Sequence, residues 1–268
     1  MVESKLYTTN EVMAVAVSRE LADDELGYMG TATGDRAFTI ACGIPIVAAR
    51  IAQLSHAPGF SLFWNNVLDP ELEHLPATFS AHQLVTWPCA AELSTSDGND
   101  MLAKNDFAVS FVSAAQVDRY GNMNITVIGN YSRPKVRLVG CLAQTELLAY
   151  PRKPICIVDM DKRVFVEKVD YVTGVGHLFG GDSREKAGLR PGGTWRVITD
   201  KAVFGFHPQT KEMVLLSVHP GVRVQEVLDL MSFRPLFTEP VPETDPPTDE
   251  QVRLIRETID PNKILLRG

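Results

Sequence analysis

The sequence lacks the marks of several common classes of protein. Its four cysteines form no CxxC pair, so it predicts neither a zinc or redox motif nor a disulfide framework. No stretch approaches the roughly 18 uninterrupted apolar residues that a membrane-spanning helix needs. The N-terminal segment MVESKLYTTNEVMAV has an early acid and no long apolar core, so it does not predict a signal peptide. We therefore expect a cytoplasmic protein.

Positive charge is scarce as well. The chain has 26 lysine and arginine residues against 33 aspartate and glutamate residues, which gives a net charge of −7 at pH 7. A nucleic-acid surface needs a basic face that neutralises phosphates, and this balance argues against one. Small anionic molecules are not excluded, because a few local positive groups or a helix N-terminus suffice to bind them.

The signature motifs of several enzyme classes are also absent. The segment GTATGD does not fit the dinucleotide pattern GxGxxG, and no GxxxxGK[ST] phosphate-binding loop occurs. There is no GxSxG elbow for a nucleophilic serine. The six histidines show no HxxxH or HExxH spacing, so the sequence predicts no metal site.

The sequence does contain an alternation of helix and strand patterns. Thr8 precedes Glu11 by three residues, the spacing of a capping box, which predicts the start of a first helix. The glycine- and threonine-rich segment that follows predicts a turn or short hairpin before Gly43. Pro45 then suits the first turn of a second helix. The apolar run Phe60–Phe63 is too short for a helix and predicts a strand buried on both faces.

Further apolar segments continue this alternation. NDFAVSFVSAAQVD, RKPICIVDMD and KRVFVEKVDYVTG each predict a strand. The segment from Trp195 to Gly221 predicts consecutive strands with a turn near Pro208, and RVQEVLDLMS predicts a short helix. Strands that alternate with helices predict an α/β fold with an open, mainly parallel sheet flanked by helices.

The chain ends in a segment of a different kind. Residues Glu239–Glu250 include five acids and four prolines, which predicts an extended arm. Thr248 and Gln251 then have the spacing that caps a final helix. We expect one α/β domain over residues 1–238, with an acidic, proline-rich arm and a C-terminal helix over residues 239–268 packed on it.

Two stretches are candidates for ligand binding. In ACGIP, Cys42 and Gly43 come just before the expected helix, whose free backbone N–H groups could hold an oxyanion or a carboxylate; the alternative is a tight turn. In SAAQVDRYGNMN, polar residues follow a strong strand, and open α/β sheets bind ligands at the carboxyl ends of their strands. The alternative there is again an ordinary turn. The candidates in this second stretch are Gln116, Asp118, Gly121 and Asn122.

Several distinctive segments occur together in one order: AQVDRYGNMNITVIGNYSRPKVRLVG, KVDYVTGVG, REKAGL, VITDKAVFGF and HPGVRVQEVLD through PPTDEQVRLIRETIDP. They resemble the β subunit of class I CoA-transferases, especially that of glutaconate CoA-transferase, from about Tyr7 to about Pro261. The resemblance implies an open parallel α/β fold and a partner α subunit of related fold. It also implies an active site between the two subunits that binds acyl-CoA, so coenzyme A enters as part of the substrate and no tightly bound cofactor is expected.

The resemblance further implies where the chemistry takes place. In that family the β subunit supplies a glutamate, in an ESG- or ENG-like motif at a strand end, and its carboxylate attacks the thioester. The segment FWNN corresponds to this motif, which puts Trp64 at the glutamate position and Asn65 and Asn66 at the next two. ACGIP matches the family's GxGxP turn with Ala41 in place of its first glycine. The family's strand-end residues GGAQ correspond to Ser113, Ala114, Ala115 and Gln116.

A tryptophan at this position changes the expected reaction. Transfer by double displacement needs a nucleophile that forms a covalent intermediate, and an indole cannot replace a carboxylate. A fold that still binds the thioester can stabilise negative charge on its carbonyl, as enolate-forming reactions require. We therefore expect a CoA-thioester hydrolase or lyase, with C–C ring hydrolysis placed before decarboxylation, and with Trp64, Asn65 and Asn66 at the catalytic position. Two alternatives stay open: a true transferase that uses Glu71, Glu73 or a partner's glutamate, and a non-catalytic interface subunit.

Overall fold

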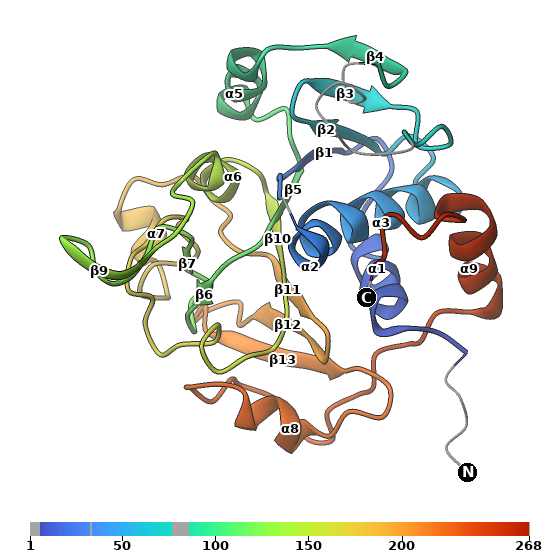
Figure 1. Cartoon of the computed structure of the whole chain (residues 1–268). Coiled ribbons are helices and arrows are strands. Elements are labelled where there is room, and N and C mark those ends of the chain that lie inside the picture. The colour runs from blue at the N-terminus through green and yellow to red at the C-terminus, as the bar shows by residue number, and fades with distance from the viewer. Residues whose placement is uncertain (1–5, 33, 77–85, 268) are drawn as a thin grey trace. The chain divides into compact units, whose positions relative to one another are not determined.

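The computed structural model describes residues 6–32, 34–76 and 86–267 (Figure 1). The chain forms two compact units: unit 1 comprises Met1–Val109 and Pro246–Gly268, and unit 2 comprises Ser110–Asp245. Both units contain strands and flanking helices, which confirms the predicted α/β class with a mixed, largely parallel sheet. None of the described helices is long and apolar enough to cross a membrane.

The first helix of unit 1 begins where the sequence predicts. In α1 (Thr9–Ser18), the Thr8 side chain accepts the Glu11 N–H and the Glu11 carboxylate accepts the Thr8 N–H, which completes the capping box. Every residue from Asn10 to Ser18 is buried. The helix packs against α3 (Ile44–Gln53), and the two supply much of the apolar core of unit 1.

The segment between these helices differs from the prediction. The expected turn or hairpin is instead strand β1 (Leu26–Met29) followed by helical residues: α2 (Asp35–Phe38), the π-turn η1 (Thr39–Gly43) and then α3. α3 begins just after Gly43, as predicted, but helical residues precede it without a break. Pro45 lies within it and would clash with a carbonyl four residues earlier in a regular α-helix, which explains why the chain widens into a π-turn just before it.

The strands of unit 1 surround a small aromatic cluster. β2 (Ser61–Trp64) pairs parallel with β1, and β3 (Val67–Pro70) and β4 (Cys89–Glu92) follow in antiparallel order. This confirms the predicted buried strand at Phe60–Phe63. Phe63 packs edge-on against Tyr28 with ring centroids 5.0 Å apart, and α5 (Thr95–Lys104) lies over it, since a Cβ at Gly98 would collide with the Phe63 ring.

Unit 2 has strands in the order β5-β10-β11-β12-β13. β10 and β11 are parallel, and β11, β12 and β13 are antiparallel neighbours, as the predicted consecutive strands with a turn near Pro208 require. Two small hairpins, β6–β7 and β8–β9, and three short helices complete the unit. Their bounds are β5 (Val109–Val112), β6 (Gln116–Val117), β7 (Met123–Asn124), β8 (Val127–Asn130), β9 (Arg133–Arg137), α6 (Gln144–Ala149), β10 (Lys153–Val158), α7 (Ser183–Lys186), β11 (Arg196–Thr199), β12 (Ala202–Phe206), β13 (Met213–Val218) and α8 (Val224–Asp229).

One predicted strand of unit 2 is wrong. The segment KRVFVEKVDYVTG forms no continuous strand, and Phe165 makes only isolated bridges with Val117 and Met231. Phe165 is fully buried, with its ring 5.7 Å from that of Phe204. The segment thus contributes a buried side chain to the core without a ladder of backbone hydrogen bonds.

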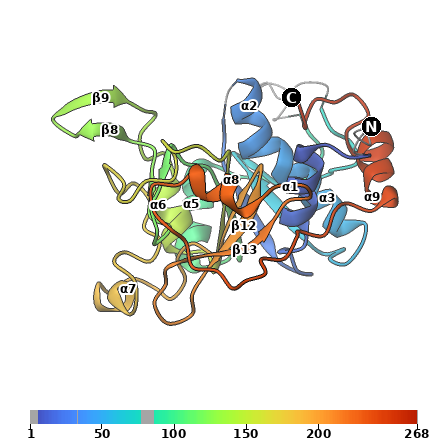
Figure 2. The same ribbon diagram turned by 90° about the horizontal axis from the view of Figure 1, so that it is seen from below.

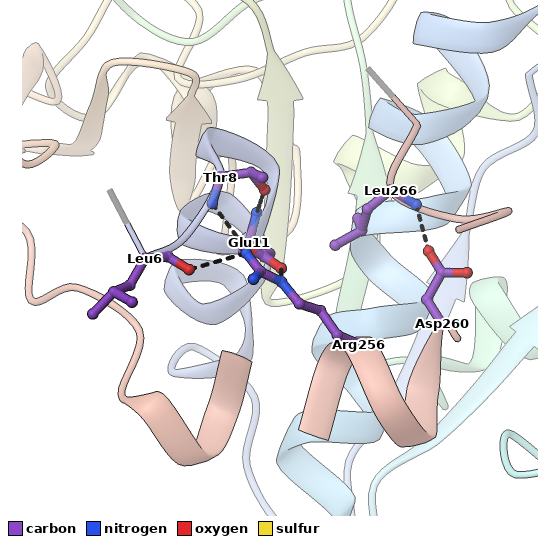
Figure 3. Close-up of polar contacts among 6 residues, drawn as sticks. All are labelled: Leu6, Thr8, Glu11, Arg256, Asp260 and Leu266. Carbon is purple, nitrogen blue, oxygen red and sulfur yellow. Dashed lines mark hydrogen bonds and ion pairs between the residues drawn. The ribbon is translucent and has the colours of Figure 1, made fainter. Parts of the chain in front are cut away.

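The C-terminal segment returns to unit 1. Thr248 and Gln251 cap α9 (Asp249–Leu254), as predicted, and a π-turn, η2 (Ile255–Ile259), extends it. The Arg256 guanidinium binds both Glu11 carboxylate oxygens, at 2.7 and 2.8 Å, and the Leu6 carbonyl (Figure 3). The Asp260 carboxylate accepts backbone N–H groups of Ile264, Leu265 and Leu266. The Arg256 contacts hold the C-terminal segment against α1, and the Asp260 contacts fix the turn that follows η2.

The Glu11–Arg256 pair predicts a stability effect. Glu11 is 4% exposed, so Arg256→Met would leave a buried carboxylate without its cation. Because Arg256 is itself about half exposed, we expect a loss of about 1–2 kcal/mol of unfolding free energy in urea. As a control, Arg223→Met removes an ion pair with Glu226 that is exposed, and should change stability by less than about 0.5 kcal/mol. Equal effects of the two variants would contradict this account.

The same pair predicts a pH dependence. Burial raises the pKa of Glu11, but its hydrogen bonds with Arg256 and Thr8 outweigh burial, so the pKa lies below its ordinary value. A lowered carboxyl pKa stabilises the fold above the unfolded pKa of about 4.3, and this contribution is lost as the pH falls through the folded-state pKa. The stability difference between wild type and Arg256→Met should therefore narrow below about pH 4. A difference that widens on acidification would refute the assignment.

Candidate functional site

Trp64 ends strand β2 in a buried position. The residue is 2% exposed, and its ring lies edge-on to that of Trp87, with centroids 6.2 Å apart and an interplanar angle of 89°. An indole in such packing supplies apolar surface and shape, with neither an acid nor a nucleophile.

Asn65 and Asn66 form the turn between β2 and β3. Trp64 pairs with Val67, which leaves a two-residue connection. Asn65 has φ 55°, a left-handed conformation that asparagine tolerates better than most residues. Its side-chain oxygen accepts the Thr31 hydroxyl at 2.7 Å, and the Asn66 carbonyl accepts the Leu93 N–H at 2.8 Å. The geometry therefore explains both asparagines as turn residues, and their predicted catalytic role stays a prediction.

Cys42 and Gly43 lie in the π-turn and not at a helix N-terminus. The N–H of the next residue, Ile44, is already donated to Thr39, which corrects the expectation of free N–H groups at the start of a helix. Gly43 is needed for space, since a Cβ there would collide with the backbone of Leu265. The Cys42 thiol donates to the Gly30 carbonyl at 3.6 Å, and burial raises its pKa to about 12. Cys42 is thus a neutral, buried thiol.

The polar residues predicted after β5 form a closed hydrogen-bond network within unit 2. Asp118 is 5% exposed, and its carboxylate accepts the backbone N–H groups of Tyr120 and Asn122, each at 3.0 Å, and the Asn122 amide. Burial raises the pKa of Asp118, and these hydrogen bonds offset part of that rise. Gly121 has φ 68°, and a Cβ there would collide with Phe206 and Thr194. The loop therefore forms a turn held by hydrogen bonds, as the alternative interpretation of the sequence expected. A ligand that binds there would contact a surface already in its final conformation.

Two amides extend this network. The Asn122 side-chain oxygen accepts the N–H groups of Gly176 and Leu178, both at 3.1 Å. The Gln116 side chain, 6% exposed, binds Asp170 and accepts the Asn124 amide at 2.7 Å. Most of these contacts come from residues more than fifty positions away in the chain, so a local sequence motif does not reveal them.

The strand end Ser113–Ala115 is half-buried and has a neighbour that sequence reasoning missed. The Gln144 amide nitrogen donates to the Ser113 carbonyl at 2.7 Å. Gln144 is 4% exposed, and within the described residues its side-chain oxygen has no hydrogen-bond partner. No motif in the sequence distinguishes this glutamine. It leaves one buried acceptor beside the residues that were predicted to hold a thioester.

Three acids near Trp64 are taken as possible replacements for the glutamate, and each has a partner or lies on another strand. Glu71 binds His74 at 2.8 Å, and Glu73 pairs with Arg50 at 3.2 Å. Glu92 lies opposite Val67, which lies opposite Trp64, so the Glu92 backbone is about 10 Å away across two strand spacings. Within the described ranges, no cluster of three or more metal-ligating side chains occurs.

The profile of the family described as "Coenzyme A transferase" matches residues 10–230. The chain belongs to the coenzyme A transferase family. Among its relatives, the B-type subunit of 3-oxoadipate CoA-transferase from Pseudomonas knackmussii is 32% identical over 93% of this chain and 92% of its own length. The B-type subunit of glutaconate CoA-transferase from Acidaminococcus fermentans is 30% identical over 97% and 96%. The cholesterol ring-cleaving hydrolase IpdB subunit of Mycobacterium tuberculosis is 33% identical over 57% of this chain and 60% of its own length.

Several solved structures share the fold of this chain. Glutaconate coenzyme A-transferase from Acidaminococcus fermentans superposes with a TM-score of 0.86 and 27% identity, covering 99% of this chain and 100% of that chain. IpdAB of Rhodococcus jostii has a TM-score of 0.78 and 25% identity, covering 97% and 98%. The decarboxylase AibA/AibB has a TM-score of 0.78 at 23% identity, covering 95% of each chain, a likeness of fold alone.

The turn conformation of Asn65 predicts which substitutions at this position leave the stability of this coenzyme A transferase family member unchanged. Asn65→Gly should keep the unfolding free energy within about 0.5 kcal/mol, because glycine adopts the left-handed conformation freely. Asn65→Ala should cost about 1–2 kcal/mol, since a Cβ disfavours that conformation. Urea unfolding of both variants measures the difference. An alanine variant as stable as the glycine variant would contradict the explanation that Asn65 is required by the left-handed conformation of the turn.

The thiols predict an order of alkylation. With iodoacetamide at about pH 8, the exposed Cys141 should react first, while Cys42 stays unmodified in the folded chain because burial holds its pKa at about 12. Peptide mapping by mass spectrometry at successive times gives the order, and urea-unfolded protein, in which every thiol reacts, is the control. Rapid alkylation of Cys42 in the folded chain would show that the thiol is accessible and ionised.

Proposed function

We propose that this chain is the B-type subunit of a heteromeric enzyme that acts on an acyl-CoA thioester without forming a glutamyl-CoA intermediate. The reaction is hydrolysis or lyase chemistry, with C–C ring hydrolysis placed before decarboxylation. Coenzyme A enters as part of the substrate, and the partner is an A-type subunit of related fold. Trp64 at the glutamate position of the family is the observation that carries the proposal.

The packing of Trp64 supports a loss of nucleophilic function. Its ring is buried against Trp87, in surroundings that would penalise a charged carboxylate by several kcal/mol unless a cation or hydrogen bonds compensated it. Covalent transfer requires a carboxylate that reaches the thioester carbon within attack distance. Glu92, the acid in the same row of the sheet, starts about 10 Å away on β4 and is exposed.

The remaining features fit chemistry that needs a stabilised thioester carbonyl and no covalent adduct. The loop after β5 is held rigidly by the Asp118 and Asn122 network, and rigid polar groups stabilise developing charge without reorganisation. In this proposal the residues Ser113–Ala115 contact the thioester. Water activation in the hydrolytic reaction falls to a side chain of the partner subunit.

The relatives include proteins named for C–C hydrolysis and proteins named for CoA transfer. The IpdB subunit of a cholesterol ring-cleaving hydrolase is 33% identical over part of the chain, which supports C–C hydrolysis. The two relatives that match nearly the whole chain are subunits of CoA-transferases, which favours the second candidate function. That candidate is transfer of CoA between carboxylic acids with a glutamate from Glu71, Glu73 or the partner. A non-catalytic interface subunit is the third.

A CoA-exchange assay on the co-expressed heteromer tests the proposal. The complex is given a cyclic 3-oxoacyl-CoA, whose ring C–C bond water can cleave, or a glutaconyl-type CoA, which can lose carbon dioxide, with an excess of a second carboxylic acid, and all CoA esters are followed by chromatography. We expect a ring-opened or decarboxylated product and no CoA ester of the second acid. Formation of that ester at the rate of substrate loss would establish transfer and overturn the proposal.

Variants at Trp64 sharpen the result. Trp64→Phe keeps an aromatic ring against Trp87 and should retain activity within about tenfold, which corresponds to about 1.4 kcal/mol.

Glu71→Gln and Glu73→Gln remove the candidate displaced nucleophiles and should leave the rate unchanged. Loss of all turnover in either glutamine variant, with the fold intact by circular dichroism, would instead identify the nucleophile of a transferase.

A further inference from the structure

The segment between Asp118 and Glu146 has an unusual charge. It contains no acidic residue, and it holds Arg119, Arg133, Lys135 and Arg137. The whole chain carries a net charge of −7, so this is a local excess of positive charge in an acidic protein. Three of the four cations lie in β9, at alternate positions that place them on one face of the strand.

The fold presents the three cations of β9 on an isolated hairpin. β8 and β9 pair with each other and, within the described residues, with no third strand. Figure 2 shows the hairpin extending away from the other elements of unit 2. Every residue of β9 is exposed or half-buried. A two-stranded hairpin without a covered face is marginally stable, and its free edges and faces can accept a partner.

Apolar side chains accompany the cations. Tyr131 is 55% exposed, Val139 75% and Leu142 72%. Tyr131 stacks on Tyr171, with ring centroids 5.3 Å apart, and the Arg137 guanidinium lies 5.0 Å from the Tyr131 ring centroid. We call the exposed side chains of residues 131–142, together with Tyr171, the hairpin surface. Aromatic residues and arginine among exposed aliphatic groups are the composition of interface hot spots.

The hairpin is tied to unit 2 close to its turn, since Gly129 lies one residue before the last paired residue of β8, Asn130. The Asp170 carboxylate accepts the Gly129 N–H at 2.9 Å and the Gln116 amide at 3.1 Å. Asp170 thus anchors β8 beside Tyr171, which stacks on the hairpin surface. A surface held in place before binding loses less conformational entropy when a partner docks.

We propose that the hairpin surface docks the A-type subunit of the heteromer, against a face of that subunit that carries carboxylates around an apolar pocket. The proposal rests on the heteromer of the proposed function. The cations of β9 complement an acidic face and raise the rate of encounter, while Tyr131, Val139 and Leu142 supply the apolar contact. The exposed aliphatic groups favour a protein over the phosphates of coenzyme A as the occupant.

Charge reversal on the hairpin tests this surface. The triple variant Arg133→Glu, Lys135→Glu, Arg137→Glu is titrated with the A-type subunit of the same enzyme, and the dissociation constant is measured by calorimetry at low and high salt. We expect binding at least tenfold weaker than wild type and a smaller dependence on salt. The matched control, Arg163→Glu, Lys186→Glu, Arg223→Glu, has the same charge change at side chains 90%, 75% and 80% exposed, and should bind within twofold of wild type.

An apolar pair of variants separates shape from charge. Val139→Ser should weaken binding severalfold, while Phe179→Ser, at a residue 77% exposed outside the hairpin, should not.

If wild type binds the A-type subunit and the hairpin triple variant binds equally well, this proposal fails while the heteromer stands. If wild type does not bind that subunit, both proposals fail. A triple variant that loses only self-association, or only coenzyme A binding, would assign the surface to a second copy or to the nucleotide and overturn the proposal.

Discussion

The candidate site depends on one packing constraint, the burial of the Trp64 indole at the end of β2. The left-handed backbone of Asn65 closes a two-residue turn, so β3 returns along β2 and Val67 lies opposite Trp64. The indole is thereby held edge-on against Trp87, with 2% of its surface exposed. A glutamate in the same place would exchange apolar contact for a buried charge, at a cost of several kcal/mol without compensating groups. The burial imposed by the β2–β3 turn therefore favours a tryptophan over a glutamate at position 64.

Unit 2 is organised around buried polar groups that have protein partners. Arg184 is 5% exposed, and its guanidinium donates to backbone carbonyls of Leu148, Ala149, Val175, Gly176 and Arg190. The amide of Asn122 holds the same stretch through the N–H groups of Gly176 and Leu178. Such satisfied networks fix loops in one conformation, because each broken bond would leave a buried polar group unpaired. The loop after β5 is for this reason a preformed surface.

Local signals predicted the elements that local chemistry controls. The caps at Thr8 and Thr248 and the apolar strand before Trp64 were all visible in a few neighbouring residues. The helical residues just before Gly43 were not predicted, and the lack of space for a Cβ at Gly43 is set by Leu265, more than two hundred residues away. Asp118, Gly121 and Asn122 gave turn signals, but the long-range partners of Gln116 and Asn122 do not follow from the pattern, and nothing in the sequence pointed to Gln144. The resemblance located Trp64, and the roles of Trp64, Asn65 and Asn66 in catalysis stay predictions.

Trapping of the covalent intermediate tests the central claim most directly. The co-expressed heteromer is incubated with acyl-CoA, treated with borohydride or hydroxylamine, and both chains are mapped by mass spectrometry. A glutamyl-CoA thioester leaves a reduced or hydroxamate-modified glutamate at one position. Our account predicts coenzyme A thioester binding with no modified carboxylate on either chain. A modified glutamate on either chain would contradict it, restore the chemistry of a transferase and name the residue that replaces Trp64 as nucleophile.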